Sequence, residues 1–550
     1  MARECSYDCS NLPATIESDT DITGLGVVIG YVGAAGIAVT LISCHYIMAY
    51  SPDLDPFRDA NGVPSRRDMP FRPNPVDLMI LRCIKGPFRS LSEKSVGALE
   101  PSTLDTRFTK AILTMSDLQL ATGIAILISG YSQLRCGLSA YHWLIVTRLA
   151  WFSSLTHLSC LTLLRNYLYI QKAKRQWRLF FMFALVVMLV TAMVPTGSFD
   201  DWRSYGRRME LPPMDYAICL FSKPVIPRSV ETLVSMVLLV CLIVFGLAFR
   251  VIKLYRPLSS FLAESLRHHI SQGMRRLLWT LYRSRTHHGG SRKFAGYVLY
   301  YPALASFLAM RLCADHFASM FFEVYWLVWS FLIGLLSLLK YLNLILPRTQ
   351  YYVMFDGSSQ NSWSFGQVMP VLLLAVPLTN ILESLYPVDR KQTENKEPEI
   401  QVNTPTPPSN DSLSMSFSYN LPLVDMASTT PSSSNLPKFD PDYNYYNETS
   451  VMKAANVYFF ICELGISGVI VFISLGNDAV MAARALNLGL LGPPVGLVTT
   501  ILISLRIDHR CRGKGSSRRV TALHTVNVVF MLLSTAAFLF LFTVIISVGY

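Results

Sequence analysis

The sequence lacks the short motifs that identify most soluble enzymes. It has no Walker A loop, no GxGxxG, no GxSxG, no HExxH and no DDxxD, which speaks against the nucleotide, hydride-transfer, serine-hydrolase and metal-dependent chemistry that these motifs carry. The eleven cysteines are dispersed and show no CxxC or Cys/His metal spacing. We therefore expect no cofactor and no metal. Cys5 and Cys9, in the N-terminal tail, have a spacing that permits a disulfide if the tail is lumenal.

Charged residues are also scarce. They make up 15% of the chain, against about 25% in an average soluble domain, whereas 51% of the residues are hydrophobic and the mean hydropathy is +0.36. The net charge of +12 is concentrated in short loops between apolar stretches, a pattern that sets the orientation of membrane proteins. The expected partner of this charge is the lipid bilayer, and no nucleic acid is expected.

Apolar stretches long enough to cross a bilayer, which takes about 20 helical residues, recur along the chain. We identify eleven, near residues 25–49, 110–133, 138–164, 178–196, 230–253, 295–313, 320–345, 364–386, 454–475, 487–505 and 521–549. Because lipid offers the backbone no hydrogen-bond partner, each should be a helix. The sequence predicts an all-α fold, a polytopic transmembrane helix bundle of about 10–11 spans. An acidic tail precedes the first stretch, so that stretch is not a cleavable signal peptide.

Basic loops orient these spans. Residues 166–178 carry four basic residues and no acid, and residues 250–293 carry ten basic residues and one acid, so both loops should be cytoplasmic.

This orientation divides the chain into four parts. They are a lumenal or extracellular tail at 1–23; a core of eight spans at 24–386, with cytoplasmic loops at 50–109 and 254–293; a polar loop at 387–452; and a C-terminal membrane segment of two to three spans at 453–550.

The polar loop at 387–452 is rich in Pro, Ser, Thr and Asn and poor in large aliphatic residues. Such a composition cannot bury enough apolar surface to fold alone, so we expect disorder. The loop contains two N-x-S/T sequons, at Asn410 and Asn447. Continuing the topology through eight spans places it outside the cytoplasm, which predicts glycosylation of both asparagines.

The positive charge of the loop at 506–519 predicts a cytoplasmic position, which is not the position that eleven full crossings would give it. Residues 506–519 carry six basic residues and one acid and should be cytoplasmic, but eleven crossings put them outside. One stretch therefore fails to cross. The candidates are 487–505, which contains Gly-Pro-Pro near its middle and can form a re-entrant hairpin, and 364–386, which contains two prolines. We favour 487–505, because it keeps the sequon loop lumenal.

The segment 258–290 has apolar residues at roughly helical spacing and arginines at many of the other positions. A basic amphipathic helix of this kind suits the anionic surface of the cytoplasmic leaflet. The sequence leaves two interpretations open: an ordinary surface helix in an inside loop, or a regulatory site for a lipid or a partner.

Carboxylates inside apolar spans are costly, so they are the residues most often retained for function. Asp117 lies about two turns into the second span, and the next span offers His142, Arg148 and His157 as partners. Without a basic partner, such a carboxyl group stays protonated and can donate a proton. The alternative is a structural ion pair or hydrogen bond near the interface.

Two further carboxylates are candidates. Glu383 has Asn380 one turn before it on the same face, and it is either a catalytic acid or a residue in contact with water at the lumenal end. Glu323 precedes Tyr325 and Trp326, which form either an interfacial aromatic belt or the wall of a pocket.

Two more acids receive less weight. Arg311 lies one turn before Asp315, which predicts a structural ion pair between them. Glu463 is the most deeply placed acid, about ten residues into its span. However, it belongs to the C-terminal segment beyond the polar loop.

The third span, at 138–164, is unusually polar for its class. It carries His142, Trp143, Arg148 and Trp151, so it should face the interior of the bundle. Aromatic rings with a few polar groups suit a cavity for an apolar, oxygenated ligand, and they also suit ordinary helix packing.

Three stretches of the chain resemble a large group of filamentous-fungal polytopic membrane proteins. They are DITGLGVVIGYVGAAGIAVTL at 21–41, LTMSDLQLATGIAILISGYSQLRCGLSAYHWLIVTRLAWFSSLTHLSCLTLLRNYL at 113–168, and SWSFGQVMPVLLLAVPLTNILESLYP at 362–387. We associate this group with the membrane-bound terpene cyclases of ascofuranone-type pathways. The resemblance covers about 21–387 and does not extend to 388–550.

The resemblance implies an integral membrane terpene cyclase of meroterpenoid secondary metabolism, which opens a terminal epoxide by acid and closes a ring. Such a reaction takes a lipophilic small molecule and needs one protonated acid. On this hypothesis Asp117 or Glu383 donates the proton, with Glu323 behind them. Physical placement alone suggests the residues that line the site: His142, Trp143, Arg148, Trp151, Tyr325, Trp326 and Asn380. The expected compartment is the endoplasmic reticulum or another endomembrane, with the plasma membrane as the alternative.

The competing hypothesis is a non-enzymatic polytopic membrane protein, either a transporter or a receptor-like sensor. The long basic cytoplasmic loop and the disordered loop both fit that class. Neither hypothesis fixes the oligomeric state.

Overall fold

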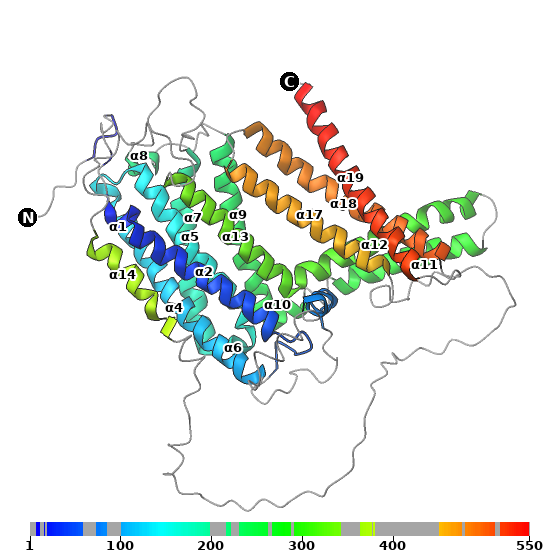
Figure 1. The fold of residues 1–550 in the computed structure, drawn as a ribbon, viewed down its shortest axis with the longest axis horizontal. Coiled ribbons are helices and arrows are strands. Elements are labelled where there is room, and N and C mark those ends of the chain that lie inside the picture. Colours follow the sequence, from blue (N-terminus) through cyan, green and yellow to red (C-terminus); the bar gives the residue numbers. More distant parts are fainter. Residues whose placement is uncertain are drawn as a thin grey trace, which may run out of the picture.

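The computed structural model describes residues 7–10, 16, 19–58, 73–84, 101–198, 216–221, 230–261, 267–287, 291–342, 363–376, 378–379, 450–475, 479–511 and 517–548. Most of these residues are helical, and none of them forms a β-strand; one isolated bridge joins Ser139 and Tyr216. The predicted all-α helix bundle is confirmed (Figure 1).

Most of the long helices surround α5 (Ala140–Leu163). They are α2 (Leu25–Met48), α4 (Pro101–Gln133), α7 (Lys172–Met193), α9 (Val230–Leu254) and α13 (Met320–Tyr341), with the shorter α14 (Phe365–Leu373) against α2. The apolar window of α5 is entirely buried. The expectation that the third span faces the bundle interior is therefore confirmed, and its polar residues follow from that position, because a lipid-facing helix would have to expose them to hydrocarbon.

A second group of helices packs beside the first. It consists of α17 (Ser450–Leu475), α18 (Ala479–Cys511) and α19 (Ser517–Val548), with α11 (Arg267–His287) and α12 (Ser291–Ala318) at one end. These five helices share their own apolar core. Contacts between α13 and α17 join the two groups.

Six helices among the described residues are long and apolar enough to cross a membrane. Their spans are Thr20–Met48, Thr106–Cys136, Ala140–Leu161, Lys172–Gly197, Met320–Leu339 and Arg518–Ala537. These helices fit a membrane protein, while the total of 10–11 spans stays a prediction.

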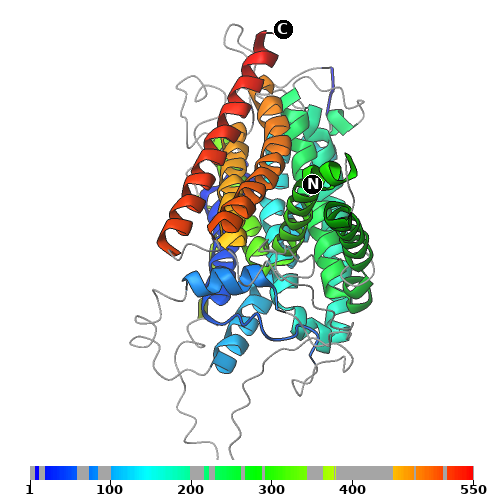
Figure 2. The same cartoon turned by 90° about the vertical axis from the view of Figure 1, so that its right-hand side faces the viewer.

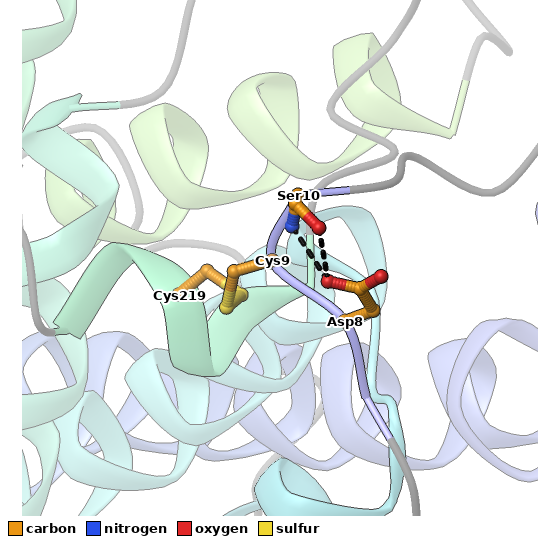
Figure 3. The surroundings of a disulfide bond; sticks show 4 residues. All are labelled: Asp8, Cys9, Ser10 and Cys219. Carbon is orange, nitrogen blue, oxygen red and sulfur yellow. Dashed lines mark hydrogen bonds between the residues drawn. A yellow bond between two sulfur atoms is a disulfide. The ribbon is translucent and has the colours of Figure 1, made fainter.

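A disulfide marks one end of the bundle. Cys9 of the N-terminal tail is bonded to Cys219 of α8 (Ala217–Phe221), with their Cα atoms 5.8 Å apart (Figure 3). Cys136, which follows α4, is disulfide-bonded as well. The expectation of a Cys5–Cys9 bridge is wrong, because Cys9 pairs across 210 residues instead. We call this the outer end; all three cysteines lie where the charge pattern places lumenal segments, and disulfides persist in such compartments.

The opposite end, which we call the inner end, is where α2 and α9 finish. Segment 73–84, which belongs to the predicted cytoplasmic loop 50–109, docks there: Asp77 accepts hydrogen bonds from the backbone N–H groups of Met320 and Phe321, both at 2.9 Å. Helix α13 therefore begins at the inner end. Helix α17 runs parallel to it, since Phe321 contacts Phe460 and Tyr325 bonds Ser467.

Helix α12 does not run between the two ends. Together with α11 it extends away from the bundle, across the direction of the long helices (Figures 1 and 2), and its last residues lie beside Lys253 of α9 at the inner end. The direction of α12 therefore disagrees with a crossing at 295–313, and α12 is not among the six candidate spans of the described residues. The preference for a re-entrant hairpin at 487–505 is wrong, because α18 continues as one helix of 33 residues through Pro493 and Pro494.

With α12 removed from the count, the charge pattern becomes consistent. Helix α14 runs parallel to α2, because Gly26 and Gly30 of α2 face Gln367 and Pro370, so α14 runs toward the inner end, and α17 starts there. The end of α18 and the start of α19 then also lie at the inner end, as the charge of residues 506–519 requires. Asn410 and Asn447 fall outside the described residues, so the predicted lumenal position of their loop stays a prediction.

Candidate functional site

Asp117 of α4 is held by Arg178 of α7. Arg178 Nε donates to Oδ1 at 2.8 Å and Nη2 donates to Oδ2 at 2.6 Å, and the arginine is buried. The partners expected from the next span were His142, Arg148 and His157, and none of them supplies this bidentate pair. Because a guanidinium engages both carboxylate oxygens, Asp117 has the geometry of a structural ion pair and not of a free acid.

Hydrogen bonds join α4 to α5 beside this pair. Ser116 Oγ lies 2.6 Å from His157 Nδ1, and Ser153 Oγ donates to Gln119 Oε1 at 3.0 Å. All four side chains are buried, so each bond satisfies groups that water cannot reach. His157, expected as a partner of Asp117, instead bonds the residue before it.

Glu323 forms an ion pair with Lys253 of α9. The same ammonium donates to the backbone carbonyls of Phe317 and Ala318, at 3.3 and 3.5 Å. Lys253 thus connects the ends of α9 and α12 to the first turn of α13. This role accounts for Glu323 without catalysis, and the sequence offered no partner for it because Lys253 lies 70 residues away.

Asp77 is a buried acid that the sequence did not single out. Besides the N–H groups of Met320 and Phe321, it accepts a hydrogen bond from the Tyr46 hydroxyl at 3.1 Å. Burial raises the pKa of Asp77, while the two backbone donors and Tyr46 act in the opposite direction. Asp77 caps α13 from a distant segment, because N-terminal helix N–H groups need an acceptor.

The first two polar residues of α5 have structural partners. His142 Nδ1 lies 2.7 Å from Ser139 Oγ, the N-cap of the helix. Trp143 Nε1 donates to the carbonyl of Ala192 at 2.9 Å, and its ring is fully buried. Both side chains fix the outer end of α5 against its neighbours.

Arg148 and Trp151 lie deeper in the bundle, and both are buried. Trp151 packs closely on α13: a Cβ added at Gly334 would meet its Nε1 atom at 2.8 Å. This approach requires glycine at 334 and ties α5 to α13. The two residues lie in the packed interior, as the sequence predicted, and their binding role stays a prediction.

The most distinctive arrangement lies at the junction of α12, α13 and α17. His316 Nε2 of α12 is 2.8 Å from Glu463 Oε2 of α17, and the two side chains are 3% and 12% exposed. The imidazole lies edge-on to Phe459, with ring centroids 4.6 Å apart, and Phe321 and Phe322 lie within 6.0 Å. His316 Nδ1 is buried without a hydrogen-bond partner among the described residues.

Tyr325 and Trp326, two of the expected lining residues, belong to the same region. The Tyr325 hydroxyl lies 2.7 Å from Ser467 Oγ of α17, and its ring contacts Phe460. Trp326 stacks on Phe322 at 6.1 Å. An acid–imidazole pair is therefore surrounded by aromatic rings from two helices. We name this set, His316 and Glu463 with these rings, the junction site.

Of the remaining predicted site residues, some lie among the described residues and some lie outside them. The ion pair between Arg311 and Asp315 is confirmed, with 3.9 Å between Nε and Oδ2. Glu383, Asn380, Asn410 and Asn447 lie outside the described residues, so their predicted roles stay predictions.

Sequence reasoning missed the junction site for a specific reason. It recognised the depth of Glu463 but set the residue aside because it follows the polar loop. It did not consider His316, which follows the predicted span at 295–313 and lies 147 residues before its partner. A histidine just before the aromatic run of α13 was the available signal.

No family model, no curated protein and no solved structure matches this chain.

Proposed function

We propose that the protein is an integral membrane enzyme that cyclises a lipophilic, epoxide-bearing terpenoid by acid catalysis, with the junction site as its reaction centre. The observation that supports this best is the buried carboxylate–imidazole pair, 2.8 Å apart and ringed by aromatic side chains. In this proposal Glu463 and His316 replace Asp117 and Glu323 as the acid. The fungal resemblance supplies the substrate class, a prenylated meroterpenoid precursor, and the endomembrane as the expected compartment.

The chemistry needs one proton held away from water. The pair donates it to the epoxide oxygen, the strained C–O bond breaks, and an internal hydroxyl or alkene of the substrate attacks the carbon that becomes electron-poor. The conjugate base then takes back the proton released on ring closure, so the overall reaction is an isomerisation. Two groups that share a proton can serve as donor and then acceptor.

The aromatic surroundings suit the same step. Positive charge develops on carbon as the epoxide opens, and ring faces stabilise a nearby cation by roughly 0.5–2 kcal/mol each, depending on desolvation. The unpartnered His316 Nδ1 is a buried polar atom beside these rings, and a substrate oxygen would satisfy it. Glu383, outside the described residues, stays a second candidate for the acid.

The test uses microsomes from a heterologous host that expresses the full chain, supplied with a panel of epoxidised meroterpenoids. We expect ring closure with the wild type and a loss of about 100-fold or more in Glu463→Gln, the range for removal of a general acid. Asp315→Asn, one position from His316 but paired with Arg311, is the matched control and should retain turnover. No product from well-expressed wild type across the panel, or full activity in Glu463→Gln, would refute the proposal.

A proton-coupled transporter is the second candidate, and the position of the pair favours it. The pair joins the two helix groups, and carboxylates and histidines at such a place serve as proton relays in transporters. Proteoliposomes with an imposed pH gradient separate the candidates. Uptake of a lipophilic anion or cation that depends on Glu463, without chemical change, would support transport over cyclisation.

A further inference from the structure

Helix α11 carries an exposed surface that the proposed reaction does not use. The helix contains five arginines and no acidic residue. One face packs on α12 through Leu278, which is fully buried, with Met274 and Leu281 beside it. Ile270, Leu277 and Trp279 stay exposed, by 54%, 47% and 55%, with Trp279 on a different side of the helix from Leu277, because residues two positions apart do not share a face.

Arginines surround the exposed indole. Arg275, Arg276 and Arg283 lie three or four positions from Trp279, which places them next to it on a helix, and all three are exposed. An indole among cationic side chains fits the boundary between lipid headgroups and acyl chains, where Trp and Arg both gain from mixed polar and apolar surroundings.

The orientation of the hairpin agrees with this chemistry. Helices α11 and α12 lie across the direction of the long helices and extend from the inner end of the bundle (Figures 1 and 2). A helix in that orientation lies in the plane of a membrane that the other helices cross. The end of α18 and the start of α19 also lie at the inner end and carry Arg506, Arg510, Arg518 and Arg519, so α11 is not the only source of positive charge among the described residues there.

We infer that α11 is an interfacial helix that binds anionic phospholipid headgroups of the inner leaflet, with Arg275, Arg276 and Arg283 as the headgroup contacts and Trp279 inserted between the lipids. Charge complementarity selects the occupant, because a leaflet that contains phosphatidylserine presents a dense negative surface to a helix without acids. The inference does not depend on the proposed reaction, and it resolves the two interpretations that the sequence left open in favour of lipid binding.

The test measures lipid contact at Trp279 in the full chain. The protein is reconstituted into phosphatidylcholine nanodiscs in which 30% of the lipid is replaced by brominated phosphatidylserine or by brominated phosphatidylcholine. The fluorescence of Trp279 is obtained by subtracting the emission of the Trp279→Phe variant from the emission of the wild type. Trp363, 60% exposed beside Asp21 at the outer end, gives the matched control through Trp363→Phe.

We expect brominated phosphatidylserine to quench Trp279 more strongly than brominated phosphatidylcholine, since each arginine near the surface enriches anionic lipid by about fivefold. Arg275→Gln with Arg276→Gln should abolish this excess, whereas the corresponding Lys substitutions should keep it. About 0.5 M salt should weaken the excess, and Trp363 should show none.

Three outcomes would overturn the inference. They are equal quenching of Trp279 by the two lipids, the same phosphatidylserine preference at Trp363, and an undiminished excess in the Gln variant. Absence of quenching by either lipid would mean that the exposed face meets water or a protein partner instead.

Discussion

Removal of Asp117 should destabilise the protein more than removal of its partner. In Asp117→Asn the guanidinium of Arg178 stays in the packed interior, where its side chain is only 6% exposed, without the carboxylate that compensated it. In Arg178→Met the carboxyl group of Asp117 remains, and its side chain is 39% exposed, so it can take up a proton or reach toward the interface at a lower cost.

The magnitudes follow from this asymmetry. Breaking a fully buried pair by removing one partner costs about 3–5 kcal/mol; because the protein does not enclose the Asp117 side of this pair, we expect about 2–3 kcal/mol for Asp117→Asn. The carboxylate left by Arg178→Met behaves more like half of a surface pair, and we expect about 1 kcal/mol. The double variant removes both charges, so its cost should fall below the sum of the single variants.

The assay is the free energy of unfolding in mixed micelles, from titration with sodium dodecyl sulfate. Asp315→Asn is the control: its partner Arg311 is at 3.9 Å and its pair is partly exposed, so it should cost less than Asp117→Asn. Additive costs in the double variant, or a larger loss from Arg178→Met than from Asp117→Asn, would refute the reasoning. If Asp117→Asn keeps its stability and loses turnover, Asp117 is the catalytic acid after all.

Three further outcomes are expected. Cys219→Ser should release the tail held through Cys9 and lower stability by about 2–4 kcal/mol; reduction should then cost the wild type more than the variant, which still holds the bond of Cys136, and equal losses on reduction would contradict the Cys9–Cys219 bond. Asp77→Ala removes the cap of α13 and should cost about 1–2 kcal/mol, with faster amide hydrogen exchange at the first turn of that helix; unchanged exchange would contradict the capping role. Asn410 and Asn447, which lie outside the described residues, stay predicted glycosylation sites; an electrophoretic shift on glycosidase treatment that Asn410→Gln with Asn447→Gln abolishes would confirm the prediction, and no shift in the wild type would contradict it.

The sequence predicted most helices but not their pairings. Length and hydropathy located α5 and its interior position, and the short spacing of Arg311 and Asp315 predicted their ion pair. Asp117 was assigned to partners on the adjacent span, whereas Arg178 lies one span further. Contacts between helices depend on rotation and packing, which a linear sequence does not specify.

The hydropathy pattern failed at α12 for a different reason. Hydropathy measures the free energy of moving residues out of water. A helix that crosses the bilayer and a helix that packs its apolar face on other helices can therefore have the same mean hydropathy. Helix α12 buries Tyr300, Leu304 and Leu308 against its neighbours, so its apolar length carried no information on its direction.

The sequence by itself determined that this is an all-helical protein of the membrane class with basic loops at one end, because those properties depend on residue content and order along the chain. Only the tertiary structure decided which acids form ion pairs with basic residues and which acid contacts a histidine. Glu463 and His316 come from helices separated by the long polar segment, and their 2.8 Å contact exists because α17 packs parallel to α13, a relation that the order of residues does not encode.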